Sequence, residues 1–201
     1  MTRLTLISFV IFFWASLCGA QTHIALFDSS LKTTHGKSVH NFLKEKLKTC
    51  QSCELLHFDF FDSNGKVNVK KMESHILGLP KNIKIIHLSW NIPFSEKYKE
   101  VVRLLNQKIA ENVKVVAAAG ESQDPFEIAL PVKETVMGQI SGAILVGELN
   151  SKGRLSNSSY FGPEIKISHP TIPGHPGSSF TSLLETAKLA LELDKTQRKD
   201  K

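Results

Sequence analysis

The chain has 201 residues, which fits one domain with a sizeable hydrophobic core. Its 41% apolar and 22% charged content is ordinary for a soluble globular protein. The formal net charge of +6 lies on a lysine-rich surface and a basic C-terminal end. No aromatic residues are interleaved with a basic stripe, which argues against nucleic-acid binding.

The first twenty residues have the layout of a secretory signal peptide. Thr2-Arg3 is a short basic start, residues 4–17 are almost all apolar, and Cys18-Gly19-Ala20 supplies small residues for cleavage. The apolar run is shorter than the roughly 20 residues that a membrane-spanning helix needs, with an uncleaved anchor as the alternative. We expect export to a periplasm or to the extracellular space, cleavage after Ala20, and no stable membrane insertion afterwards.

Apolar, β-rich runs then alternate with amphipathic helical stretches. The expected strands cover 23–27, 54–61, 82–88, 113–119, 142–146 and 165–167, and the expected helices cover 37–48, 67–77, 98–112 and 178–194. Strands separated by helices predict an α/β fold with a mainly parallel sheet and helices on both faces. No internal repeat or low-complexity linker interrupts the pattern, so we expect one domain over 21–195 and a basic tail over 196–201.

Four polar residues follow the strands or open the helices of this pattern. Asp28 follows the first strand, His35 begins the first helix, Glu121 follows Gly120 after the fourth strand, and Ser179 opens the last helix. In parallel sheets the functional site lies beyond the carboxyl ends of the strands, so these side chains share one rim. Taken singly, an Asp in a turn or a Ser at a helix N-terminus is often only a cap. Together, in the order Asp, His, Ser, they match the triad order of subtilisin.

Three segments carry the resemblance to the subtilisin-like serine peptidases. Residues 24–30 (IALFDSS) resemble the strand that ends in Asp-Ser/Thr-Gly. Residues 34–39 (THGKSV) are similar to the His-Gly-Thr-His-Val block, and residues 177–181 (GSSFT) to Gly-Thr-Ser-Met-Ala. Further similar segments lie between them in the family's order, over 85–89, 113–120, 142–153 and 156–162.

The resemblance implies a three-layer subtilisin-like fold that hydrolyses peptide or protein substrates without a metal or an organic cofactor. It implies that Ser179 attacks the substrate carbonyl, that His35 acts as general base and then acid, and that Asp28 orients His35. The residues that it places along the substrate cleft are Ser89, Trp90, Ala118 and Gly120.

Glu121 departs from the family pattern at the oxyanion position, where the family has an Asn. An ionised carboxylate only accepts hydrogen bonds, and the loss of one oxyanion donor costs on the order of 10²–10³ in rate. A protonated Glu121 can donate, which predicts activity that rises as the pH falls until His35 no longer acts as a base. The alternative is a catalytically weak or inactive relative that binds peptides.

Two further departures indicate a reduced version of the fold. Only six residues separate Asp28 from His35, which leaves no room for the family's surface hairpin and usual calcium-binding loop. Trp90-Asn91 follows Ser89 where the family prefers Leu-Gly, so we expect a narrowed or reshaped substrate cleft.

The remaining candidate residues are cysteines and histidines. In an exported chain, Cys50 and Cys53 are expected to form a disulfide. The rival reading is a thiol oxidoreductase, but reactive Cys-x-x-Cys pairs usually open a helix, whereas this pair follows a helix and precedes a strand. His169 and His175 flank a proline-rich loop without a Cys or carboxylate at a ligand-like spacing, so we expect no metal site there.

Overall fold

The computed structural model describes residues 21–62, 64–122 and 129–199. Within them, six strands form one sheet in the order β2-β1-β3-β4-β5-β6, and every neighbouring pair is parallel. The strands are β1 (Thr22–Asp28), β2 (Cys53–Asp59), β3 (Ile83–Leu88), β4 (Lys114–Ala118), β5 (Ile144–Leu149) and β6 (Ile165–Pro170). The α-helices are α1 (Thr34–Lys46), α2 (Val69–Leu77), α3 (Lys99–Ala110) and α4 (Ser178–Lys199). The expected α/β fold is confirmed.

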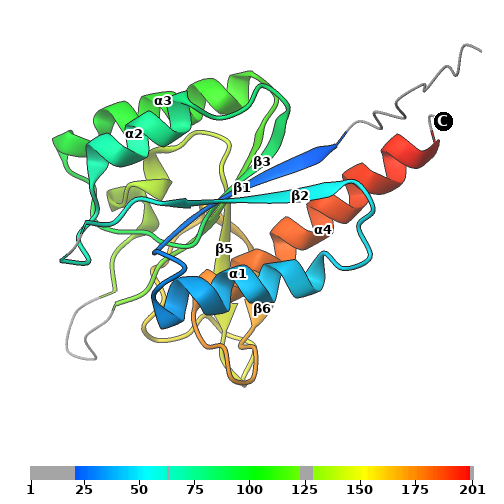
Figure 1. The fold of residues 1–201 in the computed structure, drawn as a ribbon. Coiled ribbons are helices and arrows are strands. Elements are labelled where there is room, and N and C mark those ends of the chain that lie inside the picture. Colours follow the sequence, from blue (N-terminus) through cyan, green and yellow to red (C-terminus); the bar gives the residue numbers. More distant parts are fainter. Residues whose placement is uncertain (1–20, 63, 123–128, 200–201) are drawn as a thin grey trace, which may run out of the picture.

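The sheet is the middle layer of three. Helices α2 and α3 cover one face, and α1 and α4 cover the other (Figure 1). Successive side chains of a strand point to opposite faces, so Ala25 and Phe27 pack toward α2 and α3, while Ile24 and Leu26 pack toward α1 and α4. Because both faces are covered, the central strands are mostly apolar, which is the pattern that identifies them in the sequence.

Helix α4 continues to Lys199, so the helix end predicted at Asp194 is wrong by five residues. Asp194 is buried, and its carboxylate accepts hydrogen bonds from the backbone N–H and the hydroxyl of Ser52, at 3.1 and 2.7 Å, and pairs with Arg198 one turn later. Gln197 donates to the Thr22 hydroxyl at 3.2 Å. These contacts hold the last turn of the helix against the N-terminal ends of β1 and β2, although its residues look like a basic tail.

A disulfide joins Cys50 to Cys53, with 5.5 Å between their Cα atoms, in the connection from α1 to β2. None of the helices in the described part of the chain is both long and apolar enough to cross a membrane. The expected signal peptide, residues 1–20, lies outside the described residues.

Candidate active site

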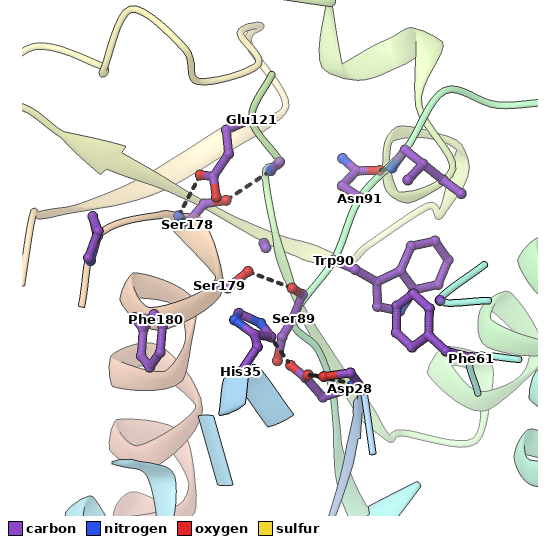
Figure 2. Close-up of a pocket in the computed structure, with 16 residues that line it drawn as sticks. Asp28, His35, Phe61, Ser89, Trp90, Asn91, Glu121, Ser178, Ser179 and Phe180 are labelled. Atoms are coloured by element: carbon purple, nitrogen blue, oxygen red, sulfur yellow. Dashed lines mark hydrogen bonds and ion pairs between the residues drawn. The ribbon is translucent and has the colours of Figure 1, made fainter. Parts of the chain in front are cut away.

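A cleft of about 680 Å³ opens where the carboxyl ends of β1, β3 and β4 meet the N-terminus of α4. It brings together all the residues expected at the triad, the oxyanion position and the substrate cleft: Asp28, His35, Ser89, Trp90, Ala118, Gly120, Glu121 and Ser179. Figure 2 shows Asp28, His35, Ser89 and Ser179 grouped at the centre, with Glu121 on one side and Trp90 on the other.

Asp28 is the last residue of β1, and only 3% of it is exposed. Its Oδ1 accepts hydrogen bonds from the backbone N–H and the hydroxyl of Ser29, at 2.5 and 2.9 Å. Burial alone would raise the pKa of Asp28, but the contact with His35, the backbone N–H of Ser29 and the nearby Ser89 hydroxyl outweigh it, and the pKa falls below its ordinary value. The carboxylate is therefore held ionised and fixed in direction.

His35 lies in the first turn of α1, with Nε2 3.6 Å from Asp28 Oδ2. The helix begins here because the Thr33 hydroxyl caps it by accepting the Gly36 N–H at 3.0 Å. A Cβ atom on Gly36 would lie 2.3 Å from the Ser29 carbonyl oxygen, so only glycine permits this short connection after Asp28. The contact with Asp28 raises the pKa of His35, burial opposes the shift, and the charge of Glu121 adds to it.

Ser179 is the second residue of α4 and is partly exposed in the cleft. Its hydroxyl donates to the Ser89 carbonyl oxygen at 2.6 Å, directly after β3, and not to His35. The preceding Ser178 is 1% exposed, and its hydroxyl accepts the Gly120 N–H at 3.1 Å. Of the two adjacent serines, Ser179 is therefore the one with a hydroxyl available to a substrate.

Glu121 lies across the cleft from His35, and its Oε2 accepts the Ser178 N–H at 2.8 Å (Figure 2). The bend at Gly120 brings it there. Gly120 has a φ of 92°, and a Cβ atom on it would lie 2.7 Å from the Tyr160 ring and 2.8 Å from the Asn91 Cβ. Glu121, the residue expected at the oxyanion position, thus caps α4.

A second carboxylate, Glu148 at the end of β5, also reaches this helix terminus. It is 6% exposed, and its Oε1 accepts the Gly177 N–H at 2.7 Å. Two carboxylates at the positive end of the helix dipole stabilise the helix. Glu148 could not be found from the sequence, because the partner of its side chain is 29 residues away in the chain and no local pattern marks the contact.

Aromatic side chains form the wall of the cleft on the side away from Glu121 (Figure 2). Trp90 packs on Phe60 with 5.2 Å between ring centroids, and Phe60 on Phe61 with 4.4 Å. Phe61, which the sequence analysis missed, also lines the cleft. The amide of Asn91 donates to the Ala119 carbonyl at 2.7 Å and accepts the N–H groups of Ile92 and Met137, so it holds the wall in place.

The two histidines of the proline-rich loop have protein partners. His175 packs against Phe180 and Phe42, with 4.6 and 5.3 Å between ring centroids. Nε2 of His169 lies 3.6 Å from Glu185 Oε2. Across the described ranges, no group of three or more His, Cys, Asp or Glu side chains is arranged to hold a metal ion.

The family model of the subtilases matches residues 23–196. Among solved structures, a lanthipeptide protease superposes with a TM-score of 0.68 at 15% identity, covering 89% of this chain and 74% of that protein. A cold-adapted subtilisin-like serine proteinase gives a TM-score of 0.63 at 12% identity, covering 89% of this chain and 77% of that protein. The epidermin leader peptide processing serine protease of Staphylococcus aureus gives a TM-score of 0.62 at 14% identity, covering 88% of this chain and 66% of that protein.

A search of curated protein sequences finds no match. The structural likeness, at these identities, is a likeness of fold. The family model adds the sequence pattern, and it spans both the strand that ends in Asp28 and the helix that Ser179 opens. The chain belongs to the subtilase family of serine peptidases.

Proposed function

We propose that the protein hydrolyses peptide bonds through Ser179, His35 and Asp28. The observation that carries this proposal is the position of the Ser179 hydroxyl, which lies in the same cleft as an imidazole that is paired with a buried carboxylate. A hydroxyl, a base and a group that orients the base are the components that acyl transfer needs.

In the first step, Ser179 Oγ attacks the substrate carbonyl carbon, and the ring nitrogen of His35 that does not face Asp28 takes the hydroxyl proton. The tetrahedral intermediate then breaks its C–N bond, and His35 gives the proton to the departing amine. A water molecule repeats the sequence on the acyl-enzyme and releases the second product. Asp28 holds the imidazole and stabilises its protonated form throughout.

The Ser179 hydroxyl has to leave the Ser89 carbonyl before it can pass its proton to His35. Such rearrangement is ordinary, since catalytic hydrogen bonds are often long or poorly aligned until a substrate binds. The backbone N–H of Ser179, in the first turn of α4, is the donor that remains for the oxyanion. Glu121 adds a negative charge beside it, so we expect slow turnover at neutral pH.

The second candidate is a peptide-binding relative with little or no catalysis. The bond from Ser179 to Ser89 and the carboxylate at the oxyanion position favour it. The cleft with its aromatic wall is common to both functions, so peptide or protein is the proposed ligand class in either case.

We also propose that the protein is exported to a periplasm or to the extracellular space. The basic start, apolar run and small residues of segment 1–20 support this location. A disulfide between Cys50 and Cys53 is in keeping with an oxidising compartment.

The test of catalysis is covalent labelling with a fluorophosphonate probe, which reacts with an activated serine. We expect labelling of the wild-type protein at pH 7.5 and none in Ser179→Ala. The matched control is Ser178→Ala, which alters the buried neighbour and should still be labelled. No labelling of folded wild-type protein at pH 5 or 7.5 would reject the proposed peptidase in favour of the peptide-binding relative.

A further inference from the structure

A histidine with no part in the chemistry above lies beneath the cleft. His87 is in the middle of β3 and is fully buried, with Leu26 of β1 on one side and Val116 of β4 on the other. Burial lowers its pKa to about 3, so the imidazole is neutral at any pH at which the protein works. A buried neutral imidazole in a central strand has to be accounted for by its hydrogen bonds.

The hydrogen bond of His87 leads to the helix that carries Ser179. His87 Nδ1 lies 2.7 Å from the hydroxyl oxygen of Thr186 in α4. Thr186 is also fully buried. Among the described residues, His87 Nε2 has no hydrogen-bond partner, so the contact with Thr186 is the hydrogen bond of this ring. The charge of Asp28 also acts on the ring, but burial outweighs it.

The same helix and strand are joined a second time at the cleft, where Ser179 donates to the Ser89 carbonyl at 2.6 Å. Thr186 follows Ser179 by seven residues, about two helical turns, so both lie on one face of α4. Ser89 follows His87 by two residues and comes directly after the end of β3. The two hydrogen bonds therefore link α4 to β3 and to the residue that follows it, one bond at the cleft and one beneath it.

We propose that His87 and Thr186 are positioning residues, an inference that rests on the proposed role of Ser179 as nucleophile. Their hydrogen bond fixes the position of α4 along its own axis relative to the sheet, and thereby the position of the Ser179 hydroxyl. Other hydrogen bonds hold α4 at its two ends: the Ser178 N–H donates to Glu121 and the Thr181 hydroxyl to the Gly147 carbonyl at its start, and Ser52 donates to Asp194 near its end. Between these ends, the contact between α4 and the sheet includes apolar side chains such as Leu183 and Ala187, whose packing has little direction. A hydrogen bond in a dry interior fixes distance and angle. A displacement of the nucleophile by about 1 Å costs on the order of 100-fold in rate.

A positioning role and a purely structural role predict different results for matched substitutions. At position 87, Leu and Asn have side chains with the same branching, but only Asn keeps a polar atom near the place of the His87 Nδ1. At position 186, Val keeps the branched shape of Thr without its hydroxyl, whereas Ser keeps the hydroxyl. Replacing both members of a buried hydrogen bond by apolar groups of similar shape is nearly neutral for stability. The double variant His87→Leu/Thr186→Val should therefore fold, while Ser179 loses its placement.

The experiment measures the maximal fluorophosphonate labelling rate and the probe concentration that gives half of it, together with the melting temperature. For His87→Leu/Thr186→Val we expect a maximal rate about ten- to hundredfold below wild type, an unchanged half-saturating concentration and a melting temperature close to that of wild type. His87→Asn and Thr186→Ser should recover most of the rate. Rates that follow the melting temperature across the three variants, or a double variant with the wild-type rate, would overturn the positioning role.

A second measurement separates this inference from the proposed function. If wild-type protein is not labelled, the proposed peptidase fails, and Ser179→Cys then reports the placement of the side chain without any hydrolysis. Iodoacetamide alkylation at position 179, followed by mass spectrometry of the peptide that contains it, should be several-fold slower in the His87→Leu/Thr186→Val background and normal in the His87→Asn background. Equal alkylation rates in all backgrounds would reject the positioning role.

Discussion

The carboxylate of Glu121 lies 2.8 Å from the backbone nitrogen of Ser178, one residue before the proposed nucleophile. This single contact has two opposite effects. It stabilises α4, because a negative charge at a helix N-terminus satisfies an unpaired N–H and interacts well with the helix dipole. In the proposed mechanism, it also places that charge beside the position where the carbonyl oxygen of a substrate becomes negative.

Replacing Glu121 by Asn should raise the labelling rate at pH 7.5 by about 10²–10³, because the change removes the repelling charge and supplies an amide donor. Asn is also a good helix cap, so α4 should keep its N-terminal support. The matched control is Glu148→Gln, which alters the other carboxylate at the same helix terminus and should leave the rate near that of wild type. If Glu121→Asn labels no faster than wild type, Glu121 is not what limits catalysis.

The pH dependence of labelling should be set by His35. The sequence predicts activity that rises as the pH falls until His35 is protonated. The contact with Asp28 raises the pKa of His35 above its ordinary 6.5, so the base form is lost before the pH falls to that value. We therefore expect weaker labelling at pH 5 than at pH 7.5. Glu121→Gln, which removes one of the charges that raise this pKa, should move the acid limb to lower pH. Stronger labelling of the wild type at pH 5 would instead indicate that a protonated Glu121 donates to the oxyanion.

The pair of Asp28 and His35 also predicts how stability depends on pH. The lowered pKa of Asp28 gives stability that is present above 3.8 and lost as the pH falls through the folded value. The raised pKa of His35 gives stability that is present below 6.5 and lost as the pH rises through the folded value. The pair therefore stabilises the fold most between these two values.

Urea unfolding at pH 5.5 and pH 8 tests this prediction. The His35 side chain is half exposed, so its contribution should be at most about 1 kcal/mol. His35→Gln should unfold with less difference between the two pH values than wild type does, and Asp28→Asn should do the same. An equally large difference in both variants would assign the pH dependence to other groups.

The fold could be predicted from the sequence because both faces of the sheet are covered. A buried parallel strand such as β3 has few polar side chains, and the helices between the strands have one apolar face, so each element is visible in a window of a few residues. The end of α4 was misplaced because its stabilising contacts, from Asp194 to Ser52 and from Gln197 to Thr22, cross most of the chain. No local pattern contains them.

The candidate site likewise has features that short sequence motifs predict and features that depend on distant contacts. The meeting of Asp28, His35 and Ser179 in one cleft could be predicted because each stands in a recognisable motif at a strand end or a helix start. The bond of Ser179 to Ser89 and the bonds of Glu121 and Glu148 to the start of α4 depend on side-chain directions across the rim of the sheet. Those directions follow from the bend at Gly120 and from the packing of α4, neither of which is visible in spacing alone.

The disulfide is expected to stabilise the fold without taking part in the chemistry. Its loop is short, so the entropy that it removes from the unfolded chain corresponds to about 2 kcal/mol. Cys50→Ser/Cys53→Ser should lower the free energy of unfolding by about that amount and leave the labelling rate of Ser179 near wild type, because the bond lies at the opposite end of α1 from His35. A thiol titration under mild reductant tests the rival oxidoreductase. Rapid opening of the disulfide in the folded protein, together with a change in the labelling of Ser179, would show that this pair is reactive and coupled to the site. A disulfide that opens only when the protein unfolds identifies a structural link between α1 and β2.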